Sequence, residues 1–106
     1  MNKLESEMIQ AINRGVKMKK DNTEVIPVDD NVVIVENYGE TIARIYFDSR
    51  EIEFVKAEHE GKISRTTSSR YRALLKEYTD IEYTTLNEEF KDYDEVPFEF
   101  SAEVES

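Results

Sequence analysis

The side chains in this sequence that are best suited to recognising a partner are carboxylates, and they gather in its last quarter. Residues 80–106 carry ten acidic side chains and one basic one, a balance of −9 within a chain whose net charge is −10. Duplex DNA carries about one charge per 1.7 Å of its axis, and protein grooves that hold it are lined with Lys and Arg. Closely spaced carboxylates can compete for such a groove. This segment therefore predicts an acidic mimic of nucleic acid.

The residues expected to contact the partner are acids accompanied by an aromatic ring. They are Asp80, Glu82, Glu88, Glu89, Asp92, Tyr93, Asp94, Glu95 and Glu99. Other rings, those of Tyr83, Phe90 and Phe98, are interleaved with them, and aromatic side chains commonly anchor protein interfaces. The alternative is that the rings complete the core and the acids form a solvated tail. The sequence alone leaves both interpretations open.

A second group of residues has the types needed to bind an anion at the start of a helix. It consists of Arg65, Thr66, Thr67, Ser68 and Arg70. Free backbone N–H groups at a helix N-terminus attract phosphate or carboxylate, and the neighbouring hydroxyl and guanidinium groups would add to this attraction. Ser and Thr are also preferred capping residues, which explains the hydroxyls without any ligand. We favour the capping interpretation.

The sequence offers few groups for catalysis or metal binding. Its one histidine, His59, lies between two glutamates in an expected loop, no Ser or Cys nucleophile motif accompanies it, and the chain has no cysteine. The three glycines are isolated, so there is no glycine-rich phosphate loop, and Asp92, Asp94 and Glu95 lack the spacing of a calcium loop. We therefore expect a protein that is not an enzyme and that uses no metal or other cofactor.

Composition also limits which cellular compartment and which class of partner we expect. No apolar run approaches the roughly 20 residues that span a membrane, and the absence of cysteine suits a reducing cytoplasm. We expect a cytoplasmic protein without membrane contact. Basic residues near the N-terminus and on the second helix are types that bind nucleic acid, but the net charge disfavours direct binding. The sequence does not indicate the oligomeric state.

Apolar residues at helical spacing predict two helices. The first covers residues 2–13, where Asn2 and Glu5 have the types and spacing of a capping box. The second begins among the hydroxyl residues at 66–69, which can cap its N-terminus, and continues to residue 78. Its apolar stripe should lie on a sheet, and basic side chains including Arg70 are expected on its outer side.

The centre of the chain predicts a sheet. Residues 31–57 read as three consecutive antiparallel strands joined by two tight turns. In the second of these strands, alternation places Ile42 and Arg44 on the same face. A short strand over residues 23–28 should precede the three, and a final strand over residues 81–85 should follow the second helix.

Length and pattern together predict one α+β domain. The chain is long enough for a single core, and two helical stripes on one antiparallel sheet bury the apolar positions. We expect about four to five strands, with the three-strand meander at the centre of the sheet, and two helices. The domain should cover residues 1–100, of which 80–100 form the acidic and aromatic extension. Residues 101–106 are expected to be a frayed acidic C-terminus.

Two motifs resemble a small domain that bacteriophages and other mobile elements often encode. The first is Gly39-Glu40-Thr41-Ile42-Ala43, a glycine-containing hairpin that leads into a strand. The second is the run Arg-Thr-Thr-Ser-Ser-Arg-Tyr-Arg-Ala-Leu-Leu at residues 65–75. The resemblance covers residues 20–80 and concerns turn, cap and core positions, so it implies no catalytic residue. Relatives of this type often carry an aromatic residue after the glycine that aligns with Gly61, whereas this chain has Lys62.

The acidic extension is similar in character to anti-CRISPR and other DNA-mimicking phage proteins, which occupy the basic groove of a host defence enzyme. That similarity implies an inhibitor that binds a host nucleic-acid-processing enzyme, above all a CRISPR-associated nuclease, in the cytoplasm of the bacterial host. Such an inhibitor blocks the binding of target DNA. The alternative is a structural or adaptor protein of a phage or mobile element that acts through protein–protein contacts.

Overall fold

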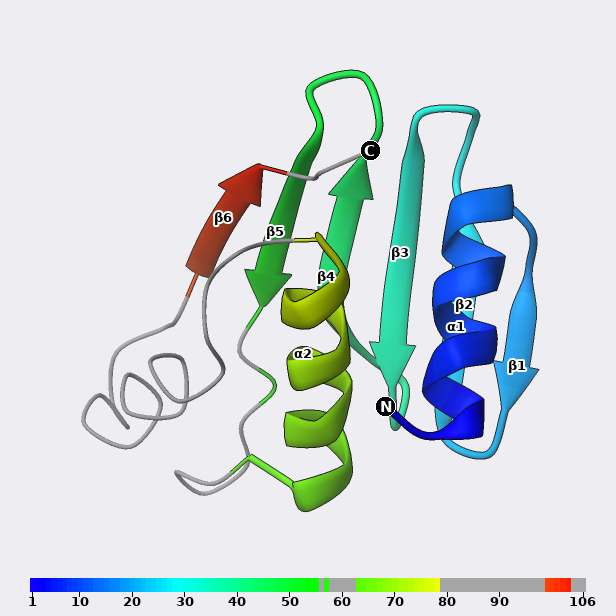
Figure 1. The fold of residues 1–106 in the computed structure, drawn as a ribbon, viewed down its shortest axis with the longest axis vertical. Helices are drawn as coiled ribbons and strands as arrows, with labels where there is room; N and C mark the ends of the chain where they lie inside the picture. Colours follow the sequence, from blue (N-terminus) through cyan, green and yellow to red (C-terminus); the bar gives the residue numbers. More distant parts are fainter. Residues whose placement is uncertain (56, 58–62, 79–98, 104–106) are drawn as a thin grey trace.

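The computed structural model describes residues 1–55, 57, 63–78 and 99–103, the last five by backbone alone. It shows an α+β fold in which two helices lie on one face of a six-stranded antiparallel sheet (Figure 1). The helices are α1 (Lys3–Arg14) and α2 (Arg65–Tyr78). The strands are β1 (Met18–Lys20), β2 (Thr23–Pro27), β3 (Val32–Asn37), β4 (Glu40–Tyr46), β5 (Glu51–Val55) and β6 (Glu99–Glu103), and they neighbour one another in chain order.

Helix α1 has the N-terminal cap that its sequence predicts. The Glu5 backbone N–H donates to Asn2 Oδ1 at 2.8 Å, and the Asn2 backbone N–H donates to Glu5 Oε1 at 3.1 Å. Two of the four N–H groups that a helix start leaves unpaired are satisfied in this way. The helix ends at Gly15 (φ 64°), and the Val16 N–H bonds back to the Ala11 carbonyl at 3.0 Å. The first predicted helix is confirmed.

The predicted three-strand meander is present as β3, β4 and β5. In this part of the sheet Val33 pairs with Ile45, and Ile45 pairs with Ile52, so side chains of one row point to the same face. All three are fully buried, and the helices cover this face. Alternation therefore determines which side of β3 and of β5 enters the core.

The register of β3 against β4 shifts between Val35 and Glu36. Val35 pairs with Ala43 but Glu36 pairs with Thr41, which leaves Ile42 as an extra residue in β4. Ile42 and Ala43 are both fully buried as a result. Simple alternation placed Ile42 on the face of Arg44, and the bulge corrects that prediction, because an inserted residue interrupts the two-residue period of a strand.

The core lies between the helices and the sheet. The α1 stripe contributes Met8 and Ile12, and the α2 stripe contributes Tyr71 and Leu74, all fully buried. The rings of Tyr71 and Phe54 meet edge to face, with centroids 6.1 Å apart. Burying a large apolar side chain contributes about 1.5–3 kcal/mol, so these stripes hold the two layers together.

Several features of the fold differ from those the sequence predicts. Helix α2 begins at Arg65, one residue earlier than predicted, because Ser64 supplies the cap: its Oγ accepts from the Thr67 N–H at 3.0 Å. Strand β1, in the basic segment after α1, was not predicted. Strand β6 is a sixth strand, and it pairs residues 101–103, which were expected to fray, with β5. The strand predicted over residues 81–85 lies outside the described residues.

Candidate functional site

The acidic segment falls almost entirely outside the part of the chain that the structure describes. Of the nine residues predicted to contact a partner, only Glu99 is placed, in β6, where its backbone pairs with Val55. The other eight lie within residues 79–98. Their role as a partner surface therefore stays a prediction from the sequence.

Two of the five residues of the predicted anion site point into the protein. Thr67 is 3% exposed, and its Oγ1 donates to Asn37 Oδ1 at 2.6 Å. Arg70 is 6% exposed and bonds to side chains of α1 and β2. Arg65, Thr66 and Ser68 lie in the first turn of α2, where Ser64 already caps the helix. The five residues do not converge on one solvent-facing point.

A buried ion pair joins the two helices. Arg70 Nη1 on α2 donates to Glu5 Oε2 on α1 at 2.8 Å, and the two side chains are 7% and 4% exposed. Ser69 Oγ donates to the same carboxylate oxygen. Both partners of the pair are charged and shielded from water, so each depends on the other and on the hydrogen bonds around it.

The same arginine continues the network into the sheet. Arg70 Nε donates to Thr23 Oγ1 on β2 at 2.9 Å, and Asn37 Nδ2 on β3 donates to that oxygen at 3.1 Å. Asn37 also reaches the Asn22 carbonyl at 3.0 Å and accepts from Thr67. Among the described residues, no buried side-chain nitrogen or oxygen lacks a partner. This network fastens both helices to β2 and β3.

Sequence reasoning placed Arg70 on the outer side of α2, and the structure shows that this is wrong. Residues 67, 70, 71, 74 and 78 are all buried and follow one another at helical spacing, so Arg70 belongs to the apolar stripe. This spacing was a usable signal. A charge inside an apolar stripe indicates a buried partner, here Glu5.

The pKa of Glu5 makes the stability that this network contributes depend on pH. Burial opposes the charged carboxylate, but hydrogen bonds from Ser69, the Asn2 N–H and Arg70 outweigh it, so the pKa of Glu5 lies below its ordinary 4.5. A depressed pKa adds stability that is present in full above the unfolded pKa and is lost as the pH falls through the folded one.

We therefore expect acid to weaken the protein through this residue. Between about pH 5 and about pH 2, the difference in free energy of unfolding between the native protein and Glu5→Gln should shrink, because protonation removes the charge that the substitution removes. Urea denaturation of both proteins at several pH values measures it. A difference that is constant across this range would show that Glu5 does not titrate as a buried, paired carboxylate.

Two buried tyrosines of α2 make hydrogen bonds that fix the packing of the core. Tyr71 Oη donates to the Val55 carbonyl and accepts from the Ala57 N–H at 3.0 Å, and burial raises its pKa to about 12. Tyr78 Oη donates to Asn13 Oδ1 at 2.7 Å, and burial raises the pKa of this phenol as well. Both hydroxyls stay protonated at neutral pH and hold the helices in place.

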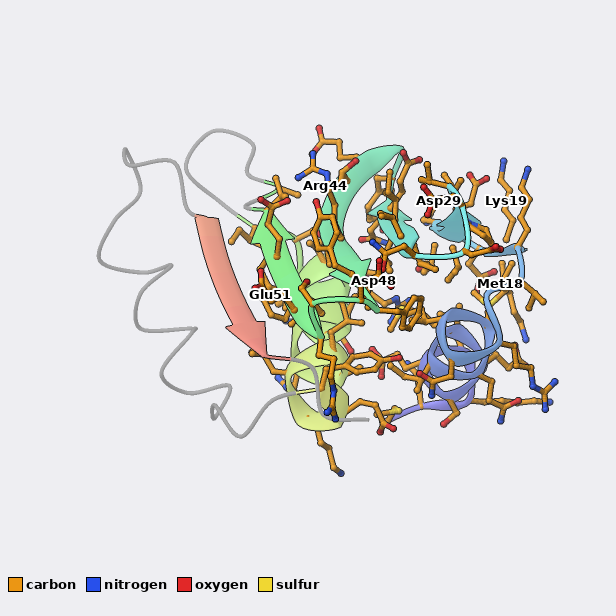
Figure 2. The ribbon with its side chains drawn as sticks, turned by 90° about the horizontal axis from the view of Figure 1, so that it is seen from above. Met18, Lys19, Asp29, Arg44, Asp48 and Glu51 are labelled. Carbon is orange, nitrogen blue, oxygen red and sulfur yellow. The ribbon has the colours of Figure 1, made fainter. Side chains whose placement is uncertain are left out.

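The face of the sheet away from the helices is another candidate surface for recognition among the described residues. Figure 2 looks along the sheet, with both helices on one side and Arg44 and Lys19 standing on the other. We call this side the outer face. Its centre is apolar, because Ile26 pairs with Ile34 across β2 and β3. All of its central side chains are partly exposed.

Two hollows open near the loops. One, of about 370 Å³, lies where the β1–β2 and β3–β4 turns meet and includes Glu24, Glu36 and Tyr38. The other, of about 290 Å³, includes Arg14, Asp30 and Phe47.

Within residues 1–55, 57 and 63–78, no three His, Cys, Asp or Glu side chains gather as metal ligands. No helix of the described chain is long and apolar enough to cross a membrane.

Comparison with known proteins gives one family. The family model described as "Kyanoviridae Gp96 protein" matches residues 1–102. No curated protein and no solved structure matches the chain. The match spans both helices and all of the strands except the last residue of β6.

Proposed function

Since the chain belongs to the Kyanoviridae Gp96 family, a family of phage proteins, we propose that it inhibits a host nucleic-acid-binding enzyme by occupying the basic groove of that enzyme. The observation that carries the proposal is the charge distribution, in which residues 80–106 hold a balance of −9. The target class is a CRISPR-associated nuclease. In this proposal the protein is not an enzyme, takes no cofactor and acts in the cytoplasm of the infected cell.

The mechanism follows from how such nucleases recognise DNA. An RNA-guided nuclease reads a short DNA motif through Arg side chains and holds the strands in a positively charged channel. Carboxylates placed in that channel would prevent target DNA from entering without contacting the guide RNA. Opposite charges accelerate the encounter of two proteins, and salt screens this attraction. Binding should therefore be fast at low salt and slower at high salt.

The test is a displacement measurement with the full chain. A CRISPR-associated nuclease loaded with its guide is given fluorescent target DNA, and the polarisation is followed as the protein is added. We expect the DNA to be released, and we expect the association rate constant of the two proteins to fall about tenfold or more between about 0.1 M and about 1 M salt. DNA binding that is unchanged at saturating protein would contradict the proposal.

A second candidate function is a non-enzymatic adaptor of the phage. The apolar centre of the outer face favours it, because contiguous exposed apolar surface is a common mark of a protein interface. In that case the protein would bind another phage protein or a second copy of itself, and it would not displace DNA from the nuclease. Mass measurement of the protein in solution, alone and with other proteins of the phage, distinguishes the two candidates.

A further inference from the structure

Most of the acidic charge lies between two elements of the fold. The chain leaves helix α2 after Tyr78 and returns to the sheet at Glu99, the first residue of β6. Strand β6 lies at the edge of the sheet beside β5 (Figure 1). We call the 20 residues from 79 to 98 the connecting segment. It carries seven of the ten carboxylates in the last quarter of the chain, and it is joined to the domain at both ends.

The first of these ends is held by α2. Tyr78 is the last residue of the helix and is 3% exposed. Its ring belongs to the hydrophobic core, and its Oη donates to Asn13 Oδ1 on α1 at 2.7 Å. A buried ring whose hydroxyl also has a partner is held at both its apolar and its polar end. The point at which the connecting segment begins is therefore fixed by both helices.

The second end is held by β6. All five residues of this strand pair with β5, from Glu99 opposite Val55 at the start of β6 to its last residue. Strand β5 in turn pairs with β4, and its Ile52 and Phe54 are fully buried in the core. The ladder hydrogen bonds set the spacing of the two backbones, so β6 takes its position from β5. The point at which the connecting segment ends is therefore fixed as well.

We propose that β6 is a positioning element for inhibition: its pairing with β5 anchors the connecting segment, so that the carboxylates of that segment bind the basic groove of the nuclease more tightly than they would from a free tail. A chain whose two ends are fixed has fewer conformations than a tail of the same length, and it loses less entropy on binding. The inference rests on the proposed function, and it adds how the fold presents the acidic charge.

A purely structural role for β6 would be to cover the edge of β5. An uncovered edge strand exposes N–H and C=O groups with which other chains can pair. In that case the carboxylates would act by their charge alone, and inhibition would not depend on whether β6 is paired. The two roles can therefore be separated by loosening β6 while every charge is kept.

Two prolines loosen β6 in this way. Successive residues of an antiparallel strand donate alternately toward and away from the neighbouring strand, so Ser101→Pro with Ala102→Pro removes a ladder hydrogen bond whichever of the two provides it. The concentration of protein that releases target DNA from a guide-loaded CRISPR-associated nuclease should rise about tenfold. The control is Val104→Pro with Ser106→Pro, beyond the last residue of β6, which should release the DNA as the native protein does.

A disulfide can restore the anchor in the loosened protein. Val55 and Glu99 pair in register at the end of β6 next to the connecting segment, and the chain has no cysteine of its own. Val55→Cys with Glu99→Cys, added to the two prolines, allows one cross-link between the strands. The oxidised protein should release DNA at about one-tenth of the concentration that the reduced protein needs. Both forms have the same sequence, so this difference reports on the anchor and not on the charge.

The other results overturn the inference. Release of DNA by the proline variant at the native concentration would show that β6 only covers the edge of β5. Equal activity of the oxidised and reduced proteins would show that fixing this end does not affect binding. Failure here is distinct from failure of the proposed function: a native protein that releases no DNA contradicts both, whereas equal release by the native and loosened proteins contradicts only the anchoring role of β6.

Discussion

Replacing Arg70 by Met should lower the free energy of unfolding by about 3–5 kcal/mol, the usual cost of removing one partner of a buried ion pair. The Glu5 carboxylate would stay 4% exposed and lose the cation at 2.8 Å. Thr23 Oγ1 would lose its bond from Arg70 Nε at the same time. Met has a similar length and keeps much of the packing, so the loss reports on charge and hydrogen bonding. Urea denaturation at neutral pH measures it.

Two further variants show where the effect arises. Lys76→Met alters a cation on the exposed side of the same helix and should change stability by no more than about 0.5 kcal/mol. Glu5→Gln combined with Arg70→Met removes both charges and keeps a residue suited to the capping box, so it should recover much of the lost stability. An Arg70→Met protein within about 1 kcal/mol of the native one would mean that the pair does not hold the helices.

The elements that the sequence predicts correctly have local signals. The capping box of α1 places both partners within three residues, and the β3–β5 meander follows from alternation and turn residues. The apolar stripe of α2 identified its buried face, which packs on the sheet as predicted. In each case the residues that decide the structure are close together in the chain.

The features that the sequence missed depend on distant partners. Glu5 and Arg70 are 65 residues apart, so no window of sequence shows that one neutralises the other. Strand β1 has only three residues, one of them apolar, and it is a strand because its backbone pairs with β2. The buried position of Ile42 follows from a shift in the pairing of β3 and β4. All three are consequences of tertiary structure.

The candidate functional residues also fall into those found from the structure and those found from the sequence. The buried network around Arg70 came from the structure, and it removes Thr67 and Arg70 from the predicted anion site. The acidic segment was identified from the charges of the sequence, which requires no fold, and most of its residues lie outside the part of the chain that the structure describes. The outer face follows from the sequence and the structure together, because the strand pairing in the structure brings Glu24 opposite Glu36.

Removing four carboxylates from the acidic segment should abolish inhibition. The variant Glu88→Gln, Glu89→Gln, Asp92→Asn and Asp94→Asn changes the net charge from −10 to −6 and retains side chains of nearly the same shape. If the segment mimics DNA, these charges supply the attraction to the groove, and the affinity for the nuclease should fall by about a hundredfold or more. An unchanged circular dichroism spectrum and melting temperature would show that the fold is retained.

A matched control separates the position of the charges from their number. Asp29→Asn, Asp30→Asn, Asp48→Asn and Glu77→Gln also bring the net charge to −6, and all four residues are exposed. Asn retains the Oδ1 atom with which Asp29 accepts the N–H groups of Asn31 and Val32. The control should inhibit almost as well as the native protein.

The most direct test is the displacement of target DNA from a guide-loaded CRISPR-associated nuclease, measured side by side for the native protein and the two fourfold variants. DNA mimicry predicts that the native protein and the control release the DNA, whereas the variant at residues 88, 89, 92 and 94 leaves it bound. Equal release by all three proteins, or release by none of them, would contradict the proposal that the acidic segment occupies the DNA groove.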